Sequence, residues 1–296
     1  MSNRTRTMLW SGWVILGFLL LPIGSGPWYF VAVAASGLAL SLVPGALPSS
    51  RRLADPQDLF VIAGLFVAVV ALNRAAFVGF TQDHVLGLFL CFAGALLLGV
   101  AGPVYYTVWV RHRTLADLGV RRDNLRAAVP FALGFAGVQF GLTLWGYDLP
   151  APVDWVPLLA MSLVIGVFES VFFRGFIQTR LEEQLGPVVG IAVAAALYGA
   201  YHVGFEMTGT DLLFLTGLGL VYAVAFAIVR NLVVLWPLLT PLGSFYANLQ
   251  GGDIELPWAS IAGFADVLGL MVLVGWLALR HQRRAGSAQA RVSHSL

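Results

Sequence analysis

The chain has 296 residues, of which 59% are hydrophobic and only 11% are charged. A water-soluble domain carries roughly 25% charged residues, so this composition excludes a soluble globular fold and indicates that most of the chain faces lipid or other helices. The single cysteine, Cys91, excludes an internal disulfide framework and a cysteine-cluster metal site.

Ten apolar stretches are long enough to cross the ~30 Å hydrocarbon core of a bilayer. In chain order they fall at residues 8–24, 28–47, 59–79, 86–110, 127–147, 155–180, 187–206, 211–229, 232–250 and 258–279. The first follows Arg4 and Arg6 as the core of a signal peptide would, but no small-residue cleavage site follows it, so we expect a retained helix. The sequence predicts an all-α, polytopic transmembrane bundle of about ten helices, within a range of eight to ten.

The basic residues predict how this bundle sits in the membrane. All of them are arginines, and ten spans place sixteen on the side of the N-terminus and only Arg74 on the other side. Because loops rich in arginine stay in the cytoplasm, we expect both termini to be cytoplasmic. The predicted localisation is that of a multi-pass integral protein of the plasma membrane.

We expect one structural domain made of five consecutive segments. Residues 1–110 form the N-terminal transmembrane helices, 111–126 a cytoplasmic amphipathic connection, 127–256 the transmembrane core, 257–285 the last transmembrane helix and 286–296 a disordered tail. Within the connection, the stretch His112–Arg126 is predicted to form a short amphipathic surface helix.

Three ionisable residues inside predicted spans are the candidate functional residues, because charge in the bilayer interior is unfavourable. They are Glu169, Arg174 and His202. Glu169 lies 17 residues before Gly186 and His202 lies 16 residues after it, and a Gly186-Pro187 turn joins the two helices. At 1.5 Å per residue both sit ~25 Å from the turn, so an antiparallel hairpin would bring them level.

A glutamate level with a histidine allows several chemistries. A desolvated carboxylate near an imidazole can hold and deprotonate a water molecule, with the histidine orienting it or stabilising charge. The same pair could carry protons in a transporter. It could also supply two ligands to a metal, although a zinc site needs three protein ligands. A purely structural pair that joins two helices is the remaining alternative.

The ninth apolar stretch is irregular. Pro237 and Pro241 stand four residues apart, and each removes a backbone hydrogen bond. Irregular backbone at membrane depth is tolerated mainly where it lines a cavity. Thr240, Ser244 and Asn248 offer polar groups to such a cavity, and a structural kink is the alternative interpretation.

Two short motifs resemble those of a known family. The sequences Glu169-Ser-Val-Phe-Phe-Arg174-Gly175 and Tyr198-Gly-Ala-Tyr-His202 resemble the Glu-Glu-x-x-x-Arg and Phe-x-x-x-His motifs of the CPBP family, the CaaX protease and bacteriocin-processing (Abi) intramembrane proteases. The resemblance covers roughly residues 114–255.

The resemblance implies an intramembrane endopeptidase whose site opens to the cytoplasm. Glu169 would activate water, His202 would assist it with or without zinc, and Arg174 would be structural or electrostatic. The implied partners are the lipid bilayer and a peptide or membrane-protein substrate, and no nucleic acid.

Three positions depart from the family pattern. Ser170 replaces the second glutamate, so Arg174 loses the carboxylate four residues earlier with which it would pair. Tyr198 replaces phenylalanine, which we interpret as a mild change. The third motif, a histidine followed four residues later by asparagine, should fall within Leu238–Asn248, and this stretch contains no histidine.

A zinc site of the family's kind is therefore incomplete, with Glu169 and His202 as its two remaining ligands. Asn248 or Glu206 could substitute for the missing one. A metal-free mechanism, in which Asn248 or a hydroxyl of the same stretch donates to the oxyanion, fits this sequence better. The alternatives are a catalytically inactive relative, acting as a membrane scaffold or partner-binding protein, and a proton-coupled transporter.

Overall fold

The computed structural model describes residues 1–22, 26–47, 55–80, 85–144, 152–236, 256 and 258–293, and every regular element within them is a helix. In chain order these are α1 (Asn3–Leu19), α2 (Pro27–Ser41), α3 (Pro56–Arg74), η1 (Ala75–Gly79), α4 (Val85–Gly94), η2 (Ala95–Ala101), α5 (Gly102–Tyr105), η3 (Tyr106–Val110), η4 (Leu115–Leu118), α6 (Leu125–Thr143), α7 (Pro152–Glu169), η5 (Ser170–Gln178), α8 (Thr179–Leu185), α9 (Pro187–Tyr201), η6 (His202–Phe205), α10 (Gly209–Val229), η7 (Leu232–Val234) and α12 (Ser260–Ser293). Of the η elements, η4, η6 and η7 are 3₁₀ turns and the others are π-helical.

Seven helical stretches in the described part of the chain are long and apolar enough to cross a membrane, as the sequence predicts for a polytopic bundle. They are Pro56–Gly79, Leu86–Val110, Leu125–Leu142, Trp155–Leu185, Pro187–Phe205, Gly209–Val229 and Ser260–Ala285. α1 and α2 add two apolar helices of 17 and 15 residues. The polytopic helical fold is thus confirmed. Most of the predicted ninth span, 232–250, lies outside the described residues.

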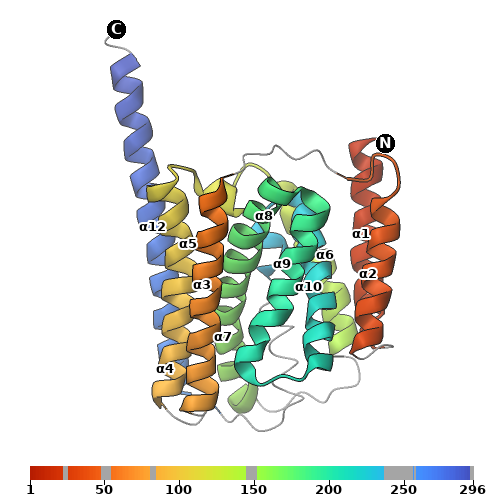
Figure 1. Ribbon diagram of the computed structural model, residues 1–296. Coiled ribbons are helices and arrows are strands. Elements are labelled where there is room, and N and C mark those ends of the chain that lie inside the picture. Colours follow the sequence, from red (N-terminus) through yellow and green to blue (C-terminus); the bar gives the residue numbers. More distant parts are fainter. Residues whose placement is uncertain are drawn as a thin grey trace.

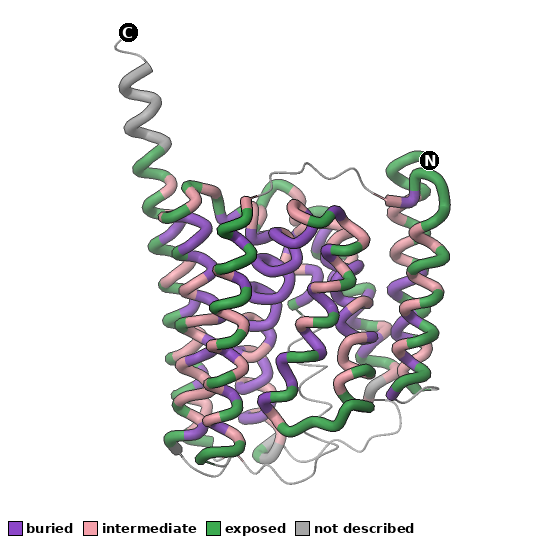
Figure 2. Tube along the Cα trace, viewed as in Figure 1, coloured by how far each residue is buried: buried purple, intermediate pink, exposed green. Residues whose placement is uncertain are grey.

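The helices stand side by side, and α1 begins on the same face of the bundle on which α12 ends (Figure 1). We call this the terminal face, and the other end of the bundle the opposite face. Two hydrophobic clusters fill the interior, one containing Phe172 and Phe176 and the other containing Tyr222 and Phe226. Buried residues gather in the middle of the bundle (Figure 2), where all nine residues of η5 are buried.

The connection over residues 111–126 differs from the predicted amphipathic surface helix. It contains a single 3₁₀ turn, Leu115–Leu118, because Thr114 and Asp117 form a capping box at its start and Gly119 ends it with a φ of 78°. Leu115 and Leu118 are both buried. The turn is therefore anchored in the core instead of resting on the surface.

One other prediction is wrong. Residues 286–293, expected to be disordered, continue α12, and the alanines, arginine and glutamine in this stretch favour a helix. Arg174 and Arg180, which the sequence places within and at the end of the span 155–180, lie inside the long helix α7–η5–α8 and are fully buried. The remaining loop and tail arginines still far outnumber Arg74.

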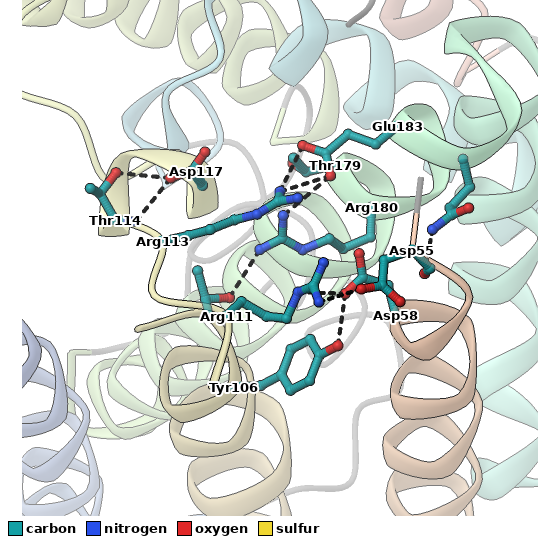
Figure 3. Close-up of polar contacts among 12 residues, drawn as sticks. Asp55, Asp58, Tyr106, Arg111, Arg113, Thr114, Asp117, Thr179, Arg180 and Glu183 are labelled. Carbon is teal, nitrogen blue, oxygen red and sulfur yellow. Dashed lines mark hydrogen bonds and ion pairs between the residues drawn. The ribbon is translucent and has the colours of Figure 1, made fainter. Parts of the chain in front are cut away.

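A cluster of charged side chains joins three helices at the terminal face (Figure 3). It contains three arginines and three acids: Arg111, Arg113, Arg180, Asp55, Asp58 and Glu183. Arg113 donates two hydrogen bonds to Glu183 in α8, of 2.9 and 2.8 Å. Arg111 pairs with Asp55 just before α3, and the N–H of Gln57 and this guanidinium lower the pKa of Asp55. The cluster fixes the end of α8 to α3 and η3.

Candidate active site

The hairpin formed by α7–η5–α8 and α9 carries the candidate site. Glu169 is the last residue of α7 and His202 the first residue after α9. Tyr201, one residue before His202, donates a hydrogen bond to Glu169 Oε1, so the two helices are level at this point as the residue counts predict. Both Glu169 and His202 are buried, with exposed fractions of 4% and 7%.

Two tyrosines of α9 hold the Glu169 carboxylate. The Tyr198 hydroxyl donates to Oε2 at 3.2 Å, and the Tyr201 hydroxyl donates to Oε1. These residues are three apart on α9, so they project from one face of the helix. A carboxylate can accept about four hydrogen bonds, so each oxygen keeps a lone pair for a water molecule or a substrate group.

His202 is oriented by the backbone of the preceding turn. Its Nδ1 lies 2.9 Å from the carbonyl oxygen of Tyr198. Because a carbonyl oxygen only accepts, Nδ1 carries the proton and a neutral imidazole has its lone pair on Nε2. The ring packs against Tyr201, with 4.0 Å between ring centroids, and against Tyr198 at 5.2 Å. Glu169 and His202 thus share two neighbours, and the described structure shows no direct ion pair between them.

Arg174 is fully buried, and none of its three guanidinium nitrogens has a hydrogen-bond partner among the described residues. Its guanidinium carbon lies 5.0 Å from the centroid of the Tyr198 ring, a cation–π contact. No described carboxylate lies within ion-pair distance, and the buried hydroxyl of Ser170 also has no partner. The counter-charge expected from the family's second glutamate is therefore missing, as the Ser170 substitution predicts.

The helix carrying Glu169 changes its winding directly after this residue. From Ser170 to Gln178 it is π-helical, with hydrogen bonds that span one residue more than in an α-helix. Gly175 allows this segment to approach the turn η4, since a Cβ there would lie 2.5 Å from the carbonyl oxygen of Leu118. Such π segments are frequent at functional sites, and this one separates Glu169 from the charged cluster at the terminal face.

The replacement of the family's phenylalanine by Tyr198 alters the site more than the sequence predicts. A phenylalanine at this position would lack the hydroxyl that donates to Glu169. The sequence alone does not single out Tyr201, because a tyrosine in an apolar run is typical of a core aromatic. The spacing of Tyr198, Tyr201 and His202 along one helix face could have identified both phenols.

The described residues do not fit a three-ligand zinc centre. No group of three or more histidine, cysteine, aspartate or glutamate side chains gathers anywhere in the described part of the chain. His202 resembles a typical metal ligand because its Nδ1 is held by a backbone carbonyl. Among the described residues, Glu169 is the only second candidate ligand beside it, since Tyr201 contacts both side chains. Zinc binding by Glu169 and His202 stays a prediction.

Glu206 and Asn248 are the two residues that could replace the missing third ligand. Glu206 has a φ of 60°, and its exposed carboxylate lies 3.4 Å from the guanidinium of Arg74. It therefore forms a surface ion pair and does not replace the missing ligand. Asn248, with the whole stretch Leu238–Asn248, lies outside the described residues.

Comparison with known proteins places these residues in a family. Residues 151–238 match the family model described as Rce1-like, type II CAAX prenyl endopeptidase Rce1-like. The matched segment belongs to the CPBP family. It includes Glu169, Arg174 and His202, and it ends at Leu238, where the third CPBP motif would begin. Neither the curated proteins nor the solved structures that were compared contain a match to this chain.

Proposed function

We propose that this protein is an intramembrane endopeptidase of the CPBP type that hydrolyses a peptide bond in a membrane-associated substrate. The observation that carries the proposal is the Glu169 carboxylate, buried and fixed by two phenols beside an oriented imidazole. A fixed, desolvated carboxylate with free lone pairs is suited to bind a water molecule and remove its proton.

The three main groups of the proposed reaction belong to one hairpin and the turn that follows it. Glu169 accepts a proton from water as the water oxygen attacks the peptide carbonyl carbon, and His202 Nε2 orients the water. The Arg174 charge favours the negative charge that develops on the carbonyl oxygen. The proton then passes from Glu169 to the leaving amine as the C–N bond breaks. Asn248 is proposed as a further donor to the oxyanion.

Replacement of Glu169 by Gln tests this proposal. The amide keeps the size of the side chain but cannot act as a base, so we expect product formation to fall ~10²–10⁴-fold. The assay uses the full chain in proteoliposomes with membrane-anchored peptides, farnesylated CaaX peptides among them, and identifies fragments by mass spectrometry. Equal product from both proteins, or no product from either, would contradict the proposal.

The competing function is a catalytically inactive CPBP relative that binds a partner in the membrane. One observation favours it: both oxygens of Glu169 already accept hydrogen bonds, so the residue could simply join α7 to α9. In that case Glu169→Gln lowers thermal stability without removing any activity. Elemental analysis of the purified protein separately decides whether a divalent metal is bound.

A further inference from the structure

A groove runs between the helix pair α1–α2 and the helices α9 and α10. The pair α1–α2 stands at one edge of the bundle (Figure 1). The groove has a volume of about 410 Å³, within the range of pockets that bind small molecules. Glu169 and His202 are not among its lining residues, so it is distinct from the candidate active site.

Close helix packing closes the groove toward the opposite face. A Cβ at Gly217 of α10 would lie 2.9 Å from the ring of Tyr29 in α2, and a Cβ at Gly17 of α1 would lie 2.5 Å from Val221. The Tyr29 hydroxyl also donates a 3.1 Å hydrogen bond to the carbonyl oxygen of Gly17. Glycines allow membrane helices to approach in this way. The groove begins at this contact and extends toward the terminal face.

The groove is about as long as one leaflet of a membrane is thick. Its lining runs from Phe30 to Ser41 on α2 and from Thr216 to Ile228 on α10. At 1.5 Å per residue these stretches measure ~16 and ~18 Å. Half of a ~30 Å hydrocarbon core is ~15 Å. One hydrocarbon chain of a lipid in the leaflet at the terminal face therefore matches the length of the groove.

The groove opens sideways to the bilayer. Leu38 on the α2 wall is 58% exposed, and Ala192 and Ala196 on the α9 wall are exposed as well. In a helix bundle that crosses the membrane, such apolar side chains face lipid. The two alanines also leave room, because neither side chain extends beyond a methyl group.

The polar groups along the walls are already satisfied within the protein. The ring N–H of Trp10 donates to a backbone carbonyl at 2.8 Å, and that of Trp13 donates to a serine hydroxyl at 3.0 Å. The hydroxyls of Ser41 and Thr216 donate to backbone carbonyls of their own helices at 2.7 and 2.8 Å. The walls therefore offer apolar contact and suit a ligand without polar groups at this depth.

Arg6 places a positive charge at the mouth of the groove, on the terminal face. Its guanidinium donates to the neutral oxygens of Asn3 and Leu47, at 2.8 and 3.5 Å. No described carboxylate lies within ion-pair distance of it. An arginine in this position is suited to bind a phosphate group, because its planar fork of N–H donors matches phosphate oxygens.

We propose that this groove is a binding site for one anionic phospholipid of the leaflet at the terminal face. One acyl chain lies between α2 and α9 along the apolar walls, and the phosphate of the headgroup binds Arg6 at the mouth. The lipid joins α1–α2 to α9 and α10 where the protein's own side chains leave space. This site does not depend on the proposed peptidase activity.

Native mass spectrometry of the purified full chain tests the proposal. The protein is exchanged into detergent that contains equal amounts of phosphatidylglycerol, which is anionic, and phosphatidylcholine, which has no net charge. The lipids that stay bound are then counted. We expect the wild-type protein to retain one phosphatidylglycerol molecule in preference to phosphatidylcholine.

Two kinds of variant separate the headgroup from the chain. Arg6→Gln should lower retention of phosphatidylglycerol about fivefold and leave phosphatidylcholine unchanged, since one arginine contributes ~1 kcal/mol to the attraction of an anionic lipid. Its matched control is Arg4→Gln, because Arg4 is an exposed arginine of the same helix that does not line the groove.

Ala196→Leu and Ala192→Leu fill the groove and should each lower retention of both lipids about fivefold or more. Ala63→Leu is the control, because Ala63 is an exposed alanine of α3 outside the groove. Both alanines that line the groove are exposed, so the larger side chain displaces lipid without entering the packed core.

Three results would overturn the proposal. The first is equal retention of phosphatidylglycerol by Arg6→Gln and Arg4→Gln, which would show that Arg6 does not bind the headgroup. The second is undiminished retention of lipid by both Ala196→Leu and Ala192→Leu. The third is a dimer of the wild-type chain that these two variants lose, which would assign the groove to a second copy of the protein.

Discussion

Removal of the two phenol hydroxyls that hold Glu169 should weaken the fold and the site together. A hydrogen bond to a charged group contributes ~1.5–3 kcal/mol, and Tyr198 and Tyr201 each donate one to this carboxylate. We expect Tyr201→Phe and Tyr198→Phe each to lower the free energy of unfolding by about that amount. The double variant should lose more than the sum, because Glu169 would keep no described hydrogen-bond donor and coupled pairs deviate from additivity by ~0.5–3 kcal/mol.

Tyr106→Phe is the matched control for this experiment. The Tyr106 hydroxyl donates a 2.8 Å hydrogen bond to Asp58, another buried carboxylate, but in the charged cluster at the terminal face. We therefore expect a similar loss of stability with no loss of peptidase activity. Thermal unfolding followed by the fluorescence of the nine tryptophans measures stability, and peptide cleavage in proteoliposomes measures activity.

Two outcomes would refute this reasoning. If Tyr201→Phe unfolds at the same temperature as the wild-type protein, the phenol does not stabilise a charged Glu169. If Tyr106→Phe loses as much activity as Tyr201→Phe, the loss reflects general destabilisation instead of a role of the phenols at the site.

Two further substitutions test the packing around the site. Ser170→Glu places a carboxylate four residues before Arg174, which has no described counter-charge. It should therefore raise the unfolding temperature above that of Ser170→Gln, which adds the same volume without charge. The reverse order would show that Arg174 needs no counter-charge. Gly199→Ala puts a Cβ 2.0 Å from Thr216 Oγ1 of α10 and should lower the free energy of unfolding by ~1–3 kcal/mol. Gly209→Ala should be nearly neutral, because its Cβ would meet no described atom within 4 Å. Equal thermal midpoints of the two variants would contradict the close packing of α9 on α10.

The sequence predicts the hairpin well because its signals are simple. Apolar length defines the spans, and counting from Gly186 places Glu169 beside the end of α9, where Tyr201 binds it. Both inferences use only the regular rise of a helix. The lack of a described carboxylate partner for Arg174 also follows directly from Ser170.

Other features could not be read from the sequence. Asp58 and Tyr106 are 48 residues apart, and nothing local shows that their side chains meet in the charged cluster. The π-helical winding of η5 depends on packing against its neighbours, since residues such as phenylalanine and isoleucine fit an α-helix equally well. The full burial of Arg180 could not be read from the sequence either, because it depends on the neighbouring helices that pack around α8.

The π-helical segment η5 also has a consequence for how this helix tolerates insertions and deletions. Each π-helical turn takes up one residue more than an α-helical turn, so the side chains that follow point in directions that an α-helix of the same length would not give them. Glu169 faces α9 at one end of the segment, while Glu183 faces Arg113 at the other. Deleting a single residue within η5 would let the helix rewind, but it would rotate one of these two contacts out of phase. A relative of this protein can therefore lose or gain a residue here only if the phase is restored nearby.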